Sequence, residues 1–106
     1  FKKSCELDYA YGCSDLAVMT RRNGDINTAV IYAIKACELG DKLGCYNVAC
    51  YRSVLKEDSA AFEYLRKAEK TGLHKRDEIL SDPDFDNLKL NPKFNENLDE
   101  IFGKAT

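Results

Sequence analysis

The sequence predicts an all-α fold in which antiparallel helix pairs stack on one another as a solenoid. When the chain is shifted by 32 residues, ten of residues 5–36 meet an identical residue. Self-similarity at such a period is typical of stacked supersecondary units. Within each unit, apolar residues recur at intervals of three and four, which is the spacing of an apolar stripe along a helix. The identical positions in the first unit are Cys5, Glu6, Leu7, Gly12, Cys13, Ala17, Ala29, Tyr32, Lys35 and Ala36.

The first unit contains two predicted helices that are joined by a tight turn. The first helix is expected from Gly12 to Arg22, and Asn23-Gly24-Asp25 forms the turn. Asp25 is a suitable N-cap, because its carboxylate can accept hydrogen bonds from the free N–H groups of the second helix. That helix ends at Leu39-Gly40, where glycine can adopt the left-handed conformation that closes many helices. Its apolar stripe is Ile26, Ala29, Val30, Ala33 and Cys37.

The second unit repeats this plan. Helices are expected from Leu43 to Leu55 and from Ser59 to Lys70, with Lys56-Glu57-Asp58 as the turn between them and Thr71-Gly72 at the end. Small residues at equivalent positions allow helix axes to approach closely, and we assign them to the core together with the apolar stripes. These small residues are Ala17 and Ala49, Ala29 and Ala61, and Ala36 and Ala68.

The rest of the chain predicts a partial third unit followed by a cap. Residues 72–80 align with the start of a unit but lack the cysteine pair. The copy breaks at Ser81-Asp82-Pro83, because a residue before proline avoids the helical region. Asp82-Pro83 and Asn91-Pro92 each resemble a helix start with proline at the first position. The apolar residues that follow them are expected to cover the open edge of the last unit.

These alignments predict one domain over residues 1–106, which is long enough for one modest core. Residues 1–8 align with the end of a helix pair, so we expect a fragment of a longer array that begins with a truncated repeat. Residues 9–40 and 41–72 form two repeats, and residues 73–106 form the partial third repeat and the cap.

Two segments of the second unit carry a family signature. They are Cys45-Tyr46-Asn47-Val48-Ala49 and the stretch from Ala61 to Ala68. Together with their counterparts in the first unit, they resemble the tetratricopeptide/Sel1-like repeat superfamily. The Cys-x7-Cys link between helix pairs resembles the cysteine-rich Sel1-like proteins, although the Gly-rich insertion of Sel1-like repeats is absent. The resemblance implies a right-handed α-solenoid.

Four of the five cysteines form two pairs with the same spacing, Cys5 with Cys13 and Cys37 with Cys45. Each pair spans a helix end and the next helix start, where an antiparallel turn can bring the Cα atoms within the ~4.4–6.8 Å of a disulfide. We expect two disulfides and an extracytoplasmic location (periplasmic or secreted) or another oxidising compartment, with a cytoplasmic protein of free thiols as the alternative. Zinc fits poorly, because its ligand spacings are shorter and the chain has one histidine. The fifth cysteine, Cys50, is expected in the core.

Charge and motifs exclude several classes of function. The 16 basic and 18 acidic residues nearly balance, which is untypical of a nucleic-acid-binding protein. No apolar run approaches the ~20 residues of a transmembrane helix, so no membrane insertion is expected. The sequence has no nucleophile–base motif, phosphate loop or metal cluster. We therefore expect no catalytic residue, metal or cofactor, and an interaction module with a protein or peptide partner.

The resemblance implies that the first helix of each pair lines a concave groove. Tyrosine and arginine on such a face suit extended peptides. Asn47 and Lys75 match two positions of the carboxylate clamp of some tetratricopeptide domains, whereas Ser14 and Val18 stand where the clamp needs basic and amide side chains. The expected groove residues are Tyr11, Ser14, Val18, Arg21, Arg22, Tyr46, Asn47, Cys50, Ser53 and Lys75.

Two alternatives stay open at this point. The resemblance to cysteine-rich Sel1-like proteins also implies a small-ligand binder or weak hydrolase of the β-lactam type, for which the chain has no Ser-x-x-Lys motif. A thiol-dependent assembly factor is the other alternative, and it requires a reactive Cys50 with a lowered pKa.

Overall fold

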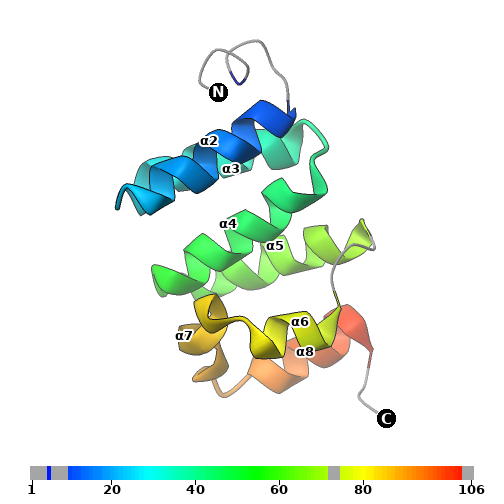
Figure 1. The fold of residues 1–106 in the computed structure, drawn as a ribbon. Helices are drawn as coiled ribbons and strands as arrows, with labels where there is room; N and C mark the ends of the chain where they lie inside the picture. Colours follow the sequence, from blue (N-terminus) through cyan, green and yellow to red (C-terminus); the bar gives the residue numbers. More distant parts are fainter. Residues whose placement is uncertain (1–4, 6–9, 72–74, 104–106) are drawn as a thin grey trace.

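The computed structural model describes residue 5, residues 10–71 and residues 75–103, and almost all of this part of the chain is helical (Figure 1). The predicted all-α class is confirmed. No strand occurs within the described ranges. The elements are α2 (Ala10–Arg22), α3 (Ile26–Glu38), α4 (Lys42–Val54), α5 (Asp58–Lys70), α6 (Arg76–Ser81), the 3-10 helix η1 (Pro83–Phe85), α7 (Asp86–Lys89) and α8 (Phe94–Phe102).

The helix ends follow local capping chemistry. The Asp25 carboxylate accepts a hydrogen bond from the Thr28 N–H at 3.1 Å, so the predicted N-cap is confirmed. Asp41 caps α4 in the same way through the Leu43 N–H at 3.1 Å. Gly40 has a φ of 94°, which confirms the predicted left-handed residue after α3. In the turn between α4 and α5, Lys56 adopts a φ of 62°, a conformation that is costly for a residue with a Cβ.

The helices form three successive layers (Figure 1). α2 packs on α3, α4 packs on α5, and α3 packs on α4, so each helix lies against its neighbour in the sequence. The helices α6, α7 and α8 lie on the far side of α4 and α5 from α2 and α3. The small residues predicted for the core are all buried: Ala17, Ala29, Ala36, Ala49, Ala61 and Ala68.

The joint between α3 and α4 is very tight. The Cα atoms of Cys37 and Cys45 lie 4.5 Å apart and their Sγ atoms are within disulfide-bonding distance. The predicted pair Cys5–Cys13 has the same geometry, with its Cα atoms 4.4 Å apart. Gly44 sits in this joint, and a Cβ there would lie 2.6 Å from the backbone nitrogen of Cys37. A side chain at this position therefore requires α3 and α4 to move apart.

The C-terminal part departs from expectation at one place. Asp82 accepts a hydrogen bond from the Asp84 N–H at 2.9 Å, and Pro83 starts η1 as expected. Asn91-Pro92, however, does not start a helix with proline first, because α8 begins at Phe94. The Asn91 side chain accepts a hydrogen bond from the Lys93 N–H at 2.8 Å and holds residues 91–93 in a turn.

Within the described part of the chain, every helix is too short or too polar to span a membrane.

Phe85, Leu88 and Leu98 are fully buried in the same cluster as Val48 and Leu65 of the second unit. The C-terminal helices thus share one core with the helix pairs that precede them.

Candidate functional site

A cavity of about 440 Å³ opens between α2, α4 and the segment Asp82-Pro83-Asp84. One wall comes from the last turns of α2 and the other from the middle of α4. The two aspartates close the third side. The lining residues are Val18, Arg21, Arg22, Tyr46, Asn47, Cys50, Tyr51, Asp82 and Asp84.

Six of the ten groove residues predicted from the sequence line this cavity: Val18, Arg21, Arg22, Tyr46, Asn47 and Cys50. The other four do not. Ser14 and Ser53 are buried, the latter where Asn87 of α7 donates hydrogen bonds to the last turn of α4. Lys75 is exposed just before α6. Tyr11 lies in α2, but its side chain is outside the described part of the chain.

Arg21 and Asp84 form an ion pair across the cavity. The two terminal nitrogens of Arg21 each donate to a different carboxylate oxygen of Asp84 at 2.7 Å. The guanidinium also lies over the ring of Tyr51, 5.1 Å from its centroid. The Asp84 hydrogen bonds raise the pKa of Arg21 above its ordinary value. This forked contact joins residues 63 positions apart in the sequence.

Tyr46 makes the second contact with the acidic segment. Its hydroxyl donates to Asp82 Oδ2 at 2.5 Å. Its ring packs edge-on against Phe85, with centroids 5.7 Å apart and an interplanar angle of 72°. Burial first, and then the neighbouring carboxylate, raise the pKa of Tyr46. The phenol therefore stays protonated and acts as a donor.

Cys50 is the buried residue of this cavity lining that lies next to Asp82. Its side chain is 3% exposed, and its Sγ is 3.9 Å from Asp82 Oδ2. Burial raises the pKa of the Cys50 thiol, and the two aspartates add to this effect. A nucleophilic or redox-active cysteine needs the opposite shift. The predicted core position is confirmed, and the reactivity that an assembly factor needs is not supported by this environment.

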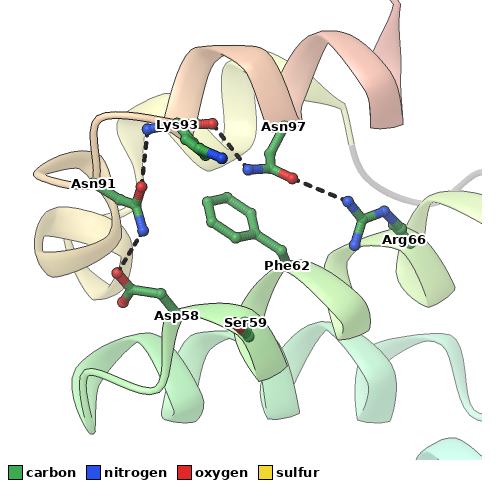
Figure 2. A pocket seen from close by; sticks show the side chains of 7 residues that line it. All are labelled: Asp58, Ser59, Phe62, Arg66, Asn91, Lys93 and Asn97. Atoms are coloured by element: carbon green, nitrogen blue, oxygen red, sulfur yellow. Dashed lines mark hydrogen bonds between the residues drawn. The ribbon is translucent and has the colours of Figure 1, made fainter.

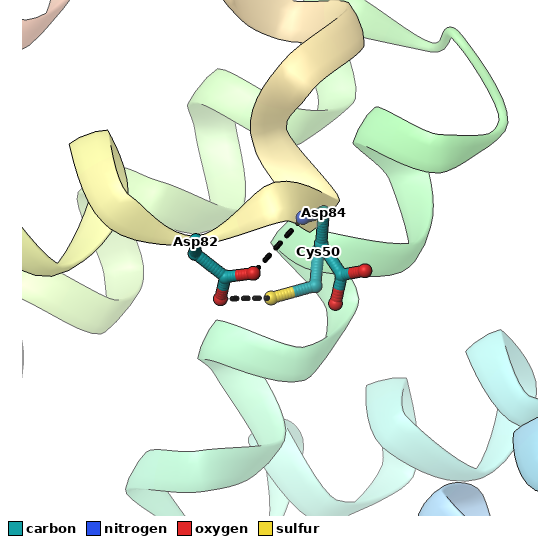
Figure 3. A group of neighbouring side chains, drawn as sticks. All are labelled: Cys50, Asp82 and Asp84. Carbon is teal, nitrogen blue, oxygen red and sulfur yellow. Dashed lines mark hydrogen bonds between the residues drawn. The ribbon is translucent and has the colours of Figure 1, made fainter.

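Cys50, Asp82 and Asp84 form a group with possible metal-ligating atoms within 4.8 Å of one another (Figure 3). A thiolate with carboxylates would suit a transition metal such as Zn²⁺. Here both Asp84 oxygens accept hydrogen bonds from Arg21, and one Asp82 oxygen accepts from Tyr46. The thiol is held in its neutral form by burial. The group is better described as a hydrogen-bonded network with a guanidinium as its cation.

Sequence reasoning missed three lining residues, Tyr51, Asp82 and Asp84. The groove expected from the first two repeats includes only residues of α2 and α4. The sequence pattern predicts only a break in the third unit at Asp82-Pro83, and nothing local to it indicates that the bend returns toward α2. The available signal was chemical, because two aspartates flank a proline in a chain whose predicted groove holds two arginines.

A second cavity, of about 300 Å³, lies between α5 and the start of α8 (Figure 2). Its polar side chains bind one another: Asn91 donates to Asp58 at 2.8 Å, and Arg66 donates to Asn97 at 3.0 Å. Figure 2 shows these contacts around the ring of Phe62. We interpret this second cavity as the seam that attaches the C-terminal helices to α5.

No protein-family model matches this chain, and neither a curated protein nor a solved structure does. The class that the fold and the site define is an all-α protein with two cysteine pairs at disulfide distance and a polar cavity between helices. The resemblance to tetratricopeptide and Sel1-like repeats stays a prediction from the sequence.

Proposed function

We propose that this chain is part of a right-handed tetratricopeptide/Sel1-like α-solenoid and acts as a protein–protein interaction module. Its partner, a peptide or protein segment, binds in the cavity between α2, α4 and Asp82-Pro83-Asp84. One observation carries the proposal. Groove residues assigned from two different sequence repeats line a single cavity, as stacked repeats require.

The cavity has the chemistry of a peptide site. Tyr46 is half-buried and supplies a ring surface, while Asn47 and Arg22 supply polar groups. Tyrosine and arginine contribute strongly to protein interfaces because each combines a large contact area with directional hydrogen bonds. The buried, protonated Cys50 favours an interaction role over thiol chemistry.

The test of the proposal uses two variants of exposed basic residues. Arg22→Ala changes the last residue of α2 at the cavity, whereas Lys70→Ala changes the last residue of α5, which does not line it. The wild-type chain, both variants and Asn47→Ala are immobilised, and the amount of partner protein that each one captures is measured. Weaker capture by Arg22→Ala and Asn47→Ala, with capture by Lys70→Ala unchanged, is expected. Equal capture by all four proteins would contradict the proposal.

A second candidate is supported by the size of the cavity. Its volume of about 440 Å³ falls in the range of small-ligand sites, roughly 300–1,000 Å³. Binding of a β-lactam-like ligand is therefore the alternative function. A β-lactam that raises the melting temperature of wild type, but not of Tyr46→Phe with Asn47→Ala, would favour it.

The cysteine pairs support an extracytoplasmic location, either periplasmic or secreted. The native protein is expected to show two disulfides and one free thiol when its intact mass is measured after alkylation, with and without reductant. Five alkylated thiols without reductant would favour a cytoplasmic protein instead.

A further inference from the structure

The cavity already holds carboxylates from its own chain. Asp84 occupies the hydrogen-bonding fork of Arg21, and Asp82 accepts from the hydroxyl of Tyr46. Both aspartates belong to one short segment that reaches the cavity from the C-terminal layer. The donors that face this cavity are therefore arranged for an acidic segment, and Asp82-Pro83-Asp84 is the acidic segment that they bind in this structure.

The Arg21–Asp84 pair is accessible and can be exchanged. The two side chains are 31% and 28% exposed, so water and competing anions reach them. Pairs at such positions shift an equilibrium by roughly fivefold at most (about 1 kcal/mol). The following residue, Phe85, is fully buried and keeps the segment in place.

A second arginine, Arg22, lines the same cavity. Arg22 is exposed and makes no hydrogen bond or ion pair with any residue that the structure describes. When Asp84 turns away, Arg21 and Arg22 present two positive charges at the end of α2. A peptide with two carboxylates complements this pair better than a neutral peptide does.

We propose that the partner is an acidic peptide segment and that Asp84 competes with it for Arg21. This inference rests on the proposed function, because it assigns the chemistry of the segment that the cavity binds. One carboxylate of the partner replaces Asp84 on Arg21, and a second binds Arg22. Asp82 stays on Tyr46 throughout. Asp84 thereby lowers the affinity of the cavity and selects for segments with more than one acidic residue.

The experiment measures fluorescence anisotropy of a labelled peptide of four Asp-Ala repeats, with four Asn-Ala repeats as the neutral probe. Asp84→Asn is expected to tighten binding of the Asp peptide about fivefold, since it removes the competing charge. The matched control is Asp99→Asn, which makes the same change in net charge and breaks the Arg76–Asp99 ion pair away from the cavity. Circular dichroism melting verifies that each variant is folded.

The inference predicts that Asp99→Asn binds the Asp peptide about as tightly as wild type does. It also predicts that the double variant Arg21→Gln with Asp84→Asn loses the gain in affinity that Asp84→Asn alone produces. Equal effects of Asp84→Asn and Asp99→Asn would overturn it, as would failure of the Asp peptide to bind Asp84→Asn at all. If Arg22→Ala and Asn47→Ala weaken partner capture while the Asp peptide does not compete with that partner, this inference fails and the proposed function stands. If neither variant affects capture, the proposed function fails.

Discussion

Replacement of Gly44 by alanine is expected to destabilise the protein, which is the opposite of the usual effect in a helix. Glycine-to-alanine changes within helices ordinarily stabilise by about 1 kcal/mol. Gly44 is the third residue of α4, where the helix starts against the end of α3. A Cβ there would lie 2.6 Å from the Cys37 nitrogen and 2.8 Å from the carbonyl carbon and Cβ of Ala36.

These distances are well below the ~3.5–4.0 Å at which carbon atoms normally meet, so the end of α3 must move away from α4. The Cys37–Cys45 pair, whose Sγ atoms lie at disulfide distance, spans the same joint, and a bond between them limits that movement. Overpacking of this kind costs about 2–3 kcal/mol. For a chain of 106 residues this corresponds to a loss of roughly 10–20 °C in melting temperature.

The assay is thermal unfolding followed by circular dichroism for wild type, Gly44→Ala and Gly44→Ala with Ala36→Gly. The double variant removes the contact with the Ala36 Cβ but leaves the backbone contact with Cys37, so partial recovery is expected. A melting temperature for Gly44→Ala equal to or above that of wild type would refute the steric argument.

Three further predictions concern local features. Lys56→Gly should raise the free energy of unfolding by about 1 kcal/mol in a denaturant titration, because Lys56 adopts a φ of 62° that glycine adopts freely; an unchanged midpoint would argue against strain there. The hydrogen bonds from Thr28 lower the pKa of Asp25, so its stabilising effect is present above the ordinary carboxyl pKa near 4 and is lost as the pH falls through the lowered value. Asp25→Ala should therefore reduce the melting temperature at pH 7 but hardly at pH 2, and a pH-independent reduction would contradict this. Cys50 should resist iodoacetamide in the native protein at pH 8 and react after denaturation, because burial raises its pKa; rapid native alkylation would contradict the burial.

Much of the helical layout follows from local chemistry in the sequence. The predicted helices from Gly12 to Arg22, Leu43 to Leu55 and Ser59 to Lys70 end within two residues of α2, α4 and α5. Turn residues and caps decide these ends, and they act over three or four positions. The prediction that Asn91-Pro92 starts a helix is wrong, because α8 begins at Phe94. The Asn91 side chain also donates to Asp58, which is 33 residues away, and no local pattern indicates this contact.

The cavity lining likewise contains a part that the sequence predicts and a part that it does not. Its α2 and α4 walls are what the resemblance to tetratricopeptide-like repeats implies, because such repeats line a groove with one face of the first helix of each pair. Ser14 and Ser53 belong to the same expected face but are buried. Periodicity defines a face of a helix, whereas the packing of other segments decides how much of that face remains open.

The sequence by itself determined the helix pairs, the two cysteine pairs and the glycine at the joint, because each depends on residues close together along the chain or on an exact repeat. Only the tertiary structure decided that Asp82 and Asp84 lie in the cavity. Their partners, Tyr46 and Arg21, are 36 and 63 residues away. The bend after α6 and the burial of Phe85 bring these charges together, and no local pattern in the sequence encodes such a distance.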